Sequence, residues 1–196
     1  QTDVGTYTTE DLILVGGNAG NYFLADDVKG TEFTIQPAPL TITANSNAIT
    51  YGGAPDNDGV TYKGFVGGEN EYTPNILNGK LDYTYDYQQY DQVGRYTITP
   101  GGLTSKNYNI DFKEGPLFVE QKTISINWGS TTYTYDGNLW APSATAGEMV
   151  NGDKLTLTVT GQKTDAGEHT ATVTEIQGEK AGNYKLPDVT TKSFTI

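Results

Sequence analysis

The sequence repeats itself, and this repetition limits the possible folds more than any other feature of the chain. Three short sequence motifs, called signposts below, occur in the same order three times. The phrase Val-Gly-x-Tyr, or a close variant, stands at Val4–Tyr7, Val93–Tyr96 and Ala166–His169. An Asn-Tyr pair then begins at Asn21, Asn107 and Asn183, and a closing strand-like segment follows at Glu32–Ile35, Leu117–Val119 and Ser193–Ile196. The period is about 80 residues, which fits a small sandwich domain and is too long for one turn of a solenoid.

The front half of the repeat occurs only twice. Leu40–Gly53 aligns with Lys122–Gly137, and Asn78–Tyr87 aligns with Asn151–Gly161. Neither segment has a counterpart before Val4, so we expect Gln1 to stand at a fragment boundary.

These alignments divide the chain into three parts. We expect residues 1–36 to be the back half of a truncated repeat, residues 37–121 a first complete β repeat, and residues 122–196 a second. Pro37 and Pro39 lie at the first joint. Because proline restricts the backbone, it favours a short, stiff connection over a floppy linker.

The residue types predict strands joined by tight turns. Leu40, Ile42 and Ala44 alternate with Thr, which is the period-two pattern of a half-buried strand. The 14 Tyr residues and many Thr favour strands, and the 24 Gly residues favour turns. We predict an all-β fold of tandem small β-sandwich modules of the Ig-like kind. A helical turn within Gly64–Pro74 would favour the alternative, β-grasp-like modules with one short helix.

Composition excludes several function classes. The formal charge is −12, and phosphate binding needs clustered Lys and Arg, so we expect no nucleic-acid partner. No apolar run is long enough for a membrane span, and we expect no membrane insertion. With no Cys and only His169, the Ser-His and Cys-His catalytic sets and the multi-His metal sites have no basis, and we expect no enzyme.

Several motifs carry a resemblance to a known family. The segments TITANSNAITYGG, GFVGGEN, DQVGRYTITPGGLTSKNYNIDF and PLFVE resemble the MBG-type (YGX) repeats of bacterial surface proteins. The segments TYTYDG, VNGDKLTLTVTG, DAGEHTATV and AGNYKLP resemble a related repeat in which YDG stands for YGG. The resemblance implies an extracellular protein, secreted or attached to the cell wall at the bacterial surface. Its tandem modules would form a stalk, spacer or adhesin shaft with neighbouring repeats as partners, and it implies no catalytic residues.

Four aromatic residues support an alternative function. Trp140 lies in a turn beside a proline, Trp128 ends an alternating segment, and Tyr87 and Tyr90 have no apolar counterpart in the aligned repeat. Exposed aromatic rings stack on sugar rings. The alternative prediction is therefore a module that binds a host or dietary glycan or mucin through these four side chains.

A metal site has one candidate position. Asp56 and Asp58 alternate before Gly59, as carboxylates do in calcium loops. The further oxygen ligands of a calcium loop are missing from this segment, so we expect an ordinary Asx turn here and no cofactor.

Two further expectations concern the signposts and the truncated repeat. His169 aligns with Tyr7 and Tyr96, so we expect a ring at the start of a strand rather than a ligand or base. The Asn-Tyr pair is expected to be structural, with the Tyr hydroxyl tied to backbone at a corner. Strands are expected around residues 7–14, 22–24 and 33–35. Since exposed edges invite pairing, residues 1–36 should pack on the next repeat or exchange strands with a second copy.

Overall fold

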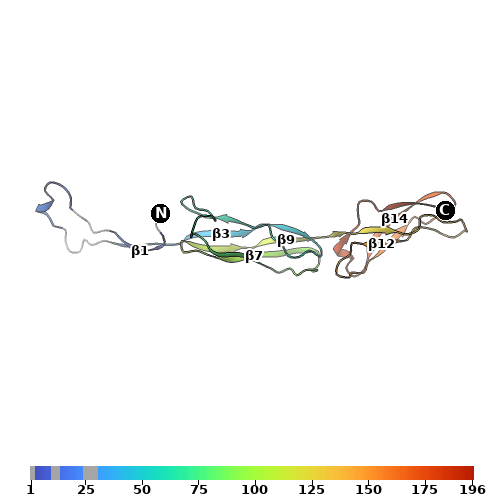
Figure 1. The fold of residues 1–196 in the computed structure, drawn as a ribbon, viewed down its shortest axis with the longest axis horizontal. Coiled ribbons are helices and arrows are strands. Elements are labelled where there is room, and N and C mark those ends of the chain that lie inside the picture. The colour runs from blue at the N-terminus through green and yellow to red at the C-terminus, as the bar shows by residue number, and fades with distance from the viewer. Residues whose placement is uncertain (1–2, 10–13, 24–30) are drawn as a thin grey trace. The chain divides into compact units, whose positions relative to one another are not determined.

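The computed structural model describes residues 3–9, 14–23 and 31–196, and the regular secondary structure of these residues is almost wholly β-strand (Figure 1). The first strands are β1 (Gly5–Thr8), β2 (Glu32–Ile35), β3 (Ala38–Ala44), β4 (Asn47–Thr50), β5 (Val60–Lys63), β6 (Asn78–Tyr85), β7 (Gly94–Thr104), β8 (Tyr108–Lys113) and β9 (Gly115–Glu120). The later ones are β10 (Lys122–Thr123), β11 (Ser125–Trp128), β12 (Ala144–Gly147), β13 (Thr156–Thr160), β14 (Glu168–Gln177), β15 (Tyr184–Lys185) and β16 (Thr191–Thr195). The all-β prediction is confirmed.

Helical structure is limited to two 3-10 turns, η1 (Ala19–Asn21) and η2 (Ala181–Asn183), in the described residues. No described helix has the length and apolarity needed to cross a membrane. The segment Gly64–Pro74 forms turns and contains no helix, because Gly67 and Gly68 both adopt positive φ, at 63° and 80°. The short helix of the β-grasp-like alternative is therefore missing from this segment.

The chain divides by its contacts into two compact units. The first comprises Gln1–Ala44, Val60–Thr84 and Thr99–Glu114, and the second comprises Asn45–Gly59, Tyr85–Ile98 and Gly115–Ile196. This division runs through the sequence repeat of residues 37–121. It leaves the residues that connect successive repeats, which are described below, inside one unit or the other.

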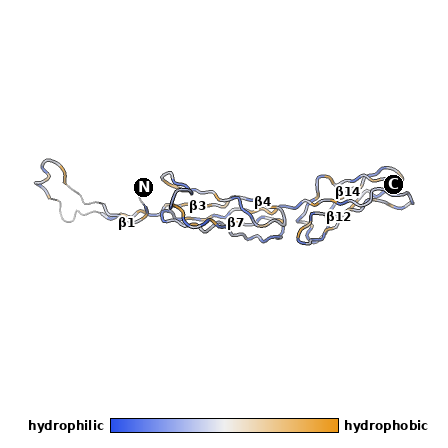
Figure 2. The backbone as a smooth tube through the Cα atoms, in the orientation of Figure 1, coloured by the Kyte–Doolittle hydropathy of each residue, from blue (hydrophilic) through white to orange (hydrophobic). Residues whose placement is uncertain are grey.

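In the first unit, β3 is the centre of a sheet with the order β5-β3-β8. It pairs antiparallel with β5 and parallel with β8. The inward side chains Leu40 and Ile42 are fully buried and form a core with Ile76 and Tyr108. Alternation along β3 thus buries one face, as the sequence pattern predicts. Figure 2 shows the same mixing of apolar and polar residues along the strands.

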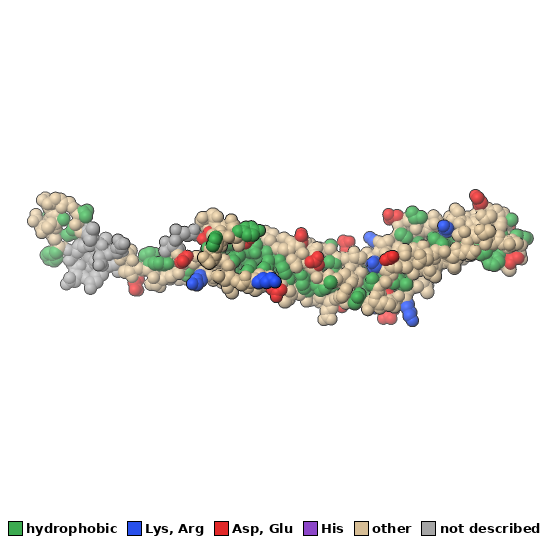
Figure 3. All heavy atoms as spheres, in the orientation of Figure 1, with side chains coloured by type: hydrophobic (Ala, Val, Ile, Leu, Met, Phe, Trp, Pro, Cys, Tyr) green, Lys and Arg blue, Asp and Glu red, His purple; other side chains and the backbone are tan. Residues whose placement is uncertain are grey.

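In the second unit, β9 pairs parallel with β4 and antiparallel with residues 94–98 of β7. Residues 122–196 add the sheets β11-β12, β13-β14-β16 and the parallel pair β10-β15. Ala171, Phe194 and Ile196 form a buried cluster here, and Trp128 and Trp140 pack against it. Figure 3 shows charged side chains scattered over the visible face rather than gathered in one patch.

The closing strand pairs with the Val-Gly-x-Tyr strand in the same register in all three repeats. Tyr7 lies opposite Phe33, Tyr96 opposite Leu117, and His169 opposite Phe194. The aligned residues of the three repeats therefore occupy equivalent positions in the three-dimensional structure.

The described part of residues 1–36 is a two-stranded sheet of β1 and β2, with a largely exposed loop. The predicted strand at residues 33–35 is confirmed as part of β2, but Tyr22 and Phe23 lie outside strands and are 72% and 93% exposed. Of the strand predicted at residues 7–14, Tyr7 and Thr8 belong to β1, whereas Thr9 and Leu14 lie outside strands. Residues 10–13 and 24 lie outside the described residues. Strand exchange with a second copy stays a prediction.

Candidate functional site: the contacts that join successive repeats

A tight turn holds the tyrosine of the Asn-Tyr pair in the third repeat. The backbone N–H of Val150 donates to the Tyr184 hydroxyl at 3.1 Å, and that hydroxyl donates to the Asp153 carboxylate at 2.6 Å. The turn closes through the Asp153 N–H and the Val150 carbonyl oxygen, 3.0 Å apart. Its central residues, Asn151 and Gly152, have φ values of 53° and 71°, which Asn and Gly tolerate best.

The second repeat builds the same arrangement from the equivalent residues. The Val66 N–H donates to the Tyr108 hydroxyl at 3.0 Å, and that hydroxyl donates to the Glu69 carboxylate. The turn again closes from Glu69 to Val66, at 3.1 Å. We call this arrangement the tyrosine clamp. Its signature is Val-x-Gly followed by an acid, and the two matching copies of that signature are the sequence signal that could have revealed it.

The clamp of the third repeat also binds a tyrosine of the second. The Tyr51 hydroxyl donates to the same Asp153 oxygen at 3.0 Å. The rings of Tyr51 and Tyr184 meet edge to face with centroids 5.3 Å apart, a favoured aromatic geometry. All three residues lie in the second unit. One carboxylate therefore ties together tyrosines from two successive repeats.

A second bond joins these repeats through the Asn-Tyr asparagine. The Asn183 side-chain oxygen accepts from the backbone N–H of Val93 at 3.0 Å, and Asn183 is only 4% exposed. Gly52 packs directly against Val150, since a Cβ built on Gly52 would lie 2.8 Å from Val150 Cγ2. The joint thus combines a buried polar bond with a close backbone approach.

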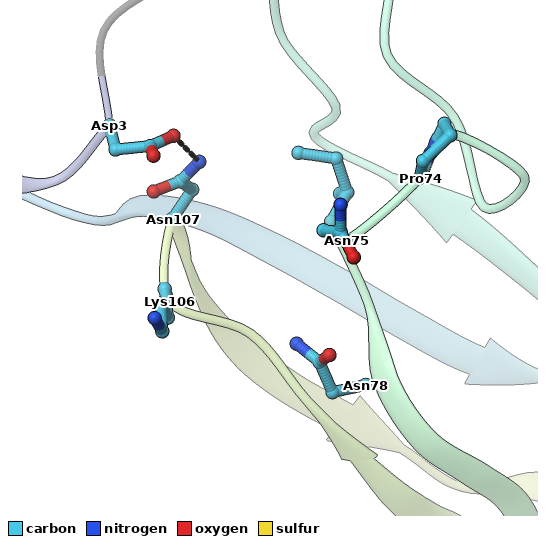
Figure 4. A pocket seen from close by; sticks show the side chains of 7 residues that line it. Asp3, Pro74, Asn75, Asn78, Lys106 and Asn107 are labelled. Carbon is cyan, nitrogen blue, oxygen red and sulfur yellow. Dashed lines mark hydrogen bonds between the residues drawn. The ribbon is translucent and has the colours of Figure 1, made fainter.

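The first and second repeats are joined by the same chemistry, within the first unit. The Asn107 side-chain oxygen accepts from the Val4 N–H at 3.1 Å, and its amide nitrogen donates to the Asp3 carboxylate at 2.9 Å (Figure 4). A cavity of about 410 Å³ opens beside this pair, with Lys106 and Asn75 in its wall. Valine of the Val-Gly-x-Tyr phrase and asparagine of the Asn-Tyr pair are therefore partners across both joints.

The ring of the Val-Gly-x-Tyr phrase makes one bond in all three repeats. Tyr7 and Tyr96 donate their hydroxyls to the carbonyl oxygens of Asp3 and Gln92, at 2.6 and 2.7 Å. His169 Nε2 lies 2.7 Å from the carbonyl oxygen of Asp165. Each bond spans four residues. The prediction that His169 is a strand-start ring is confirmed. The Asn-Tyr tyrosine is also tied to backbone as expected, but to the valine of its clamp.

Burial and nearby carboxylates oppose ionisation of the joint tyrosines. Burial, and next the hydrogen bond to Asp153, raise the pKa of Tyr184 to about 12. The pKa of Tyr51 is raised by burial and by Asp153, and that of Tyr108 by burial and by Glu69. A neutral hydroxyl can donate to a carboxylate and a phenolate cannot, so the joints are built for neutral tyrosine.

The four aromatic residues predicted to bind glycan occupy different environments. Tyr87 is 2% exposed, donates its hydroxyl to the Gly53 carbonyl oxygen at 2.9 Å, and meets Tyr96 edge to face. It continues the inward parity of Tyr83 and Tyr85 beyond the end of β6, so its ring is a core element and not the surface contact we expected.

The two tryptophans contribute to packing. Trp140 stacks on Tyr133 with centroids 4.6 Å apart and donates its indole N–H to Asp136 at 2.9 Å. Trp128 packs against the Phe194 cluster. Tyr90 is 37% exposed and has a positive φ of 75°. The structure does not gather these rings into one surface, and glycan binding stays a prediction.

The candidate metal residues lie in a turn held by its own side chains. Asp56 accepts from the Asn57 N–H at 2.8 Å, and Asn57 accepts from the Gly59 N–H at 3.1 Å, which is an Asx turn. Asp58 contributes its backbone oxygen, which accepts from the Asn45 side chain at 2.8 Å. Across the described ranges, no three His, Asp or Glu side chains come together in a group that could hold a metal ion.

Comparison with known proteins gives one family. Residues 40–118 match the family model described as MBG domain (YGX type). No curated protein matches the chain. MBG-type domains are typical of bacterial surface proteins, where they serve as repeat modules. Residues 40–118, which contain the Tyr-Gly-Gly turn, the clamp of Tyr108 and its Asn-Tyr pair, therefore correspond to an MBG domain of the YGX type.

Proposed function

We propose that the chain is a non-catalytic spacer of a bacterial surface protein, in which successive repeats are held to one another by specific hydrogen bonds. It would act outside the cell as part of a stalk or adhesin shaft, in a protein that is secreted or attached to the cell wall. The family match supports a surface repeat module. The observation that carries the proposal is the recurrence of the same Asn-to-Val bond at both joints, with Asn107 and Val4 in one and Asn183 and Val93 in the other.

A spacer must resist bending at its joints, and the geometry suits that task. Only Gln121 separates β9 from β10, and only two residues separate β2 from β3. The joint in the second unit adds the shared Asp153 carboxylate and the ring contact of Tyr51 with Tyr184. Short connections and buried polar contacts limit relative motion, because any bend would leave donors and acceptors without partners.

The chemistry of the described side chains supports the non-catalytic part of the proposal. His169 is engaged with the Asp165 carbonyl oxygen, and the chain has no thiol. The pKa of the Tyr184 hydroxyl is raised rather than lowered. A raised pKa makes the phenolate harder to form, which is the reverse of what an activated nucleophile or base requires.

The proposal predicts that the residues flanking the second joint tumble together. Backbone nitrogen relaxation should give one rotational correlation time for β7 residues 94–98 and for β14. The double substitution Asp153→Ala with Asn183→Ala should shorten the correlation time of one set relative to the other. Asn21→Ala is the matched control, because Asn21 is the exposed third member of the same motif. Separate correlation times in the unsubstituted chain would contradict a rigid joint.

A further inference from the structure

A small cavity in the first unit is not explained by the function proposed above. Its volume is about 90 Å³. It is lined by Val4, Ile35, Gln36, Ala38, Val66, Glu69, Asn107 and Tyr108. These residues come from the truncated repeat and from the clamp of the second repeat, so the cavity lies at the first joint.

Five of the eight residues that line this cavity correspond to the surroundings of Tyr51 and Gly52 at the second joint. Tyr51 contacts Tyr184 and Asp153, and an interaction with Asn183 acts on its hydroxyl. Its backbone N–H donates to the Glu120 carbonyl oxygen at 2.8 Å, and the next residue, Gly52, packs on Val150. The equivalents of these five surrounding residues in the second repeat and its predecessor are Tyr108, Glu69, Asn107, Gln36 and Val66, and all five line the cavity.

These equivalences rest on geometry as well as on sequence. The two clamps match through their hydrogen bonds, which fixes Tyr108, Glu69 and Val66. The Asn-to-Val bonds fix Asn107. The strand register places Ile35 opposite Gly5 as Val119 lies opposite Gly94, and Gln36 is therefore the counterpart of Glu120.

The strand beside the cavity has a single strand partner among the described residues. In the second repeat, β9 lies between β7 and β4, and Tyr51 follows the end of β4. The equivalent strand β2 pairs with β1, the counterpart of β7, and no other described strand pairs with it. Along this edge Phe33 is 48% exposed, and across the cavity Val66 is 49% exposed.

We propose that this cavity is a tyrosine socket, which binds a β-strand ending in Tyr-Gly from the front half of another repeat of this kind. This bound strand pairs parallel with β2, in the same register in which β4 pairs with β9. Its tyrosine enters the cavity, and the hydroxyl donates to the Glu69 carboxylate beside Tyr108. The inference uses the joint chemistry of the proposed function, but it concerns a different surface and a different ligand.

The socket selects glycine after the tyrosine. At the second joint Gly52 has a φ of +88°, and an added Cβ would lie 2.8 Å from Val150 Cγ2. Val66 occupies the equivalent place in the socket. A β-branched residue after the tyrosine would combine backbone strain with this clash, so Tyr-Gly binds and Tyr-Val does not.

The test uses a labelled peptide that has the sequence of residues 45–53. Its binding to the full chain is measured by fluorescence anisotropy. We expect saturable binding, weakened about tenfold when the peptide carries Tyr51→Phe, because a hydrogen bond to a charged group is lost. The peptide with Gly52→Val should not bind. In the protein, Val66→Phe should abolish binding, while Val189→Phe, at a site that is 72% exposed, should leave it unchanged.

The peptide could instead displace its own copy, residues 45–53, from the second joint. Binding that survives Val66→Phe, or that is insensitive to the tyrosine hydroxyl, would overturn the proposal. Absence of saturable binding of the unsubstituted peptide would overturn it as well. None of these three outcomes bears on the relaxation test of the second joint, so failure of the socket and failure of the spacer are separable.

A covalent trap gives a second, independent readout. The chain has no cysteine, and a Cβ at Gly52 would lie 3.3 Å from the Val150 Cβ, close to the spacing of a disulfide. The full chain with Val66→Cys should therefore form a mixed disulfide with the peptide carrying Gly52→Cys in a glutathione buffer. The yield should fall for a peptide that also carries Tyr51→Ser, and for the chain with Val189→Cys. Equal yields in all three cases would overturn the socket.

Discussion

The backbone N–H of Val93 donates a hydrogen bond of 3.0 Å to the side-chain oxygen of Asn183, 90 residues later in the chain. Val4 and Asn107 make the same bond at 3.1 Å. The Val-Gly-x-Tyr phrase and the Asn-Tyr pair are therefore the two halves of one contact between successive repeats. Their recurrence in a fixed order reflects the joint as well as the fold of each repeat.

The first prediction concerns the buried asparagine. Asn183→Ala removes the acceptor of the Val93 N–H at a position that is 4% exposed. A buried donor left without a partner costs about 1–3 kcal/mol, and we expect a loss of that size in the free energy of unfolding, measured by urea denaturation. Asn21→Ala, in the same motif at an exposed position, should change stability by less than about 0.5 kcal/mol. Equal losses for the two substitutions would contradict the joint.

The second prediction concerns the shared carboxylate. Asp153→Ala removes the acceptor of both the Tyr51 and Tyr184 hydroxyls. Because each hydroxyl is then buried without its charged acceptor, the loss should exceed that of Tyr51→Phe, for which we expect about 1.5–3 kcal/mol. A double-mutant cycle of Asp153→Ala with Tyr51→Phe isolates the coupling between them. Strict additivity of the two losses would show that this bond across the joint contributes nothing.

The third prediction concerns alkaline pH. The folded pKa of Tyr184 is raised from 10.0 to about 12. The stabilisation is therefore complete below pH 10 and is lost as the pH rises towards 12, because the unfolded chain ionises first. Two units correspond to about 2–3 kcal/mol. Urea midpoints measured across this pH range should fall less steeply for Tyr184→Phe than for the unsubstituted chain. Some dependence of the midpoint on pH should remain, because the pKa of other tyrosines, such as Tyr51, is raised as well.

Much of the fold could be predicted because it depends on short-range patterns. Alternation in the segment of Leu40 and Ile42 reports a buried strand face, and both side chains are fully buried. The alignment of His169 with Tyr96 predicts that His169 lies at the start of a strand. The structure agrees, because His169 pairs with Phe194 as Tyr96 pairs with the equivalent Leu117. These inferences need only neighbouring residues and the repeat period.

The joints could not be predicted because their partners belong to different repeats. Asn is typical of turns, and the sequence around Asn107 and Asn183 predicts no more than a turn. It does not show that their side chains accept a hydrogen bond from a backbone N–H of the preceding repeat. The Val-x-Gly-acid turn of the second repeat lies in Gly64–Pro74, where the sequence also allows a helical turn. In the structure Gly67 and Gly68 adopt positive φ and form a tight turn instead. The aligned repeat has no apolar counterpart of Tyr87 and so predicts a surface position, yet Tyr87 is buried, with a hydrogen bond to Gly53 and a ring contact with Tyr96.

The last prediction tests the close approach at the second joint. In the double variant Gly52→Cys with Val150→Cys, the two Cβ atoms would lie about 3.3 Å apart, just below the usual range for a disulfide, so a small shift suffices to form the bond. The natural chain has no cysteine, so no competing thiol complicates the assay. We expect a bond under mild oxidation, detected as a mass loss of two hydrogens and as protection from thiol alkylation.

The disulfide should also report on the joint energetically. Because Gly52 has a φ of +88°, cysteine there is strained, and the reduced double variant should be less stable than the unsubstituted chain. Oxidation constrains the unfolded chain and should restore at least part of that loss. The matched control pairs Gly52→Cys with Val189→Cys, which lies at an exposed site outside the joint. If the control oxidised as readily as the joint pair, the approach of Gly52 to Val150 would not persist in solution, and the joint would be a loose contact.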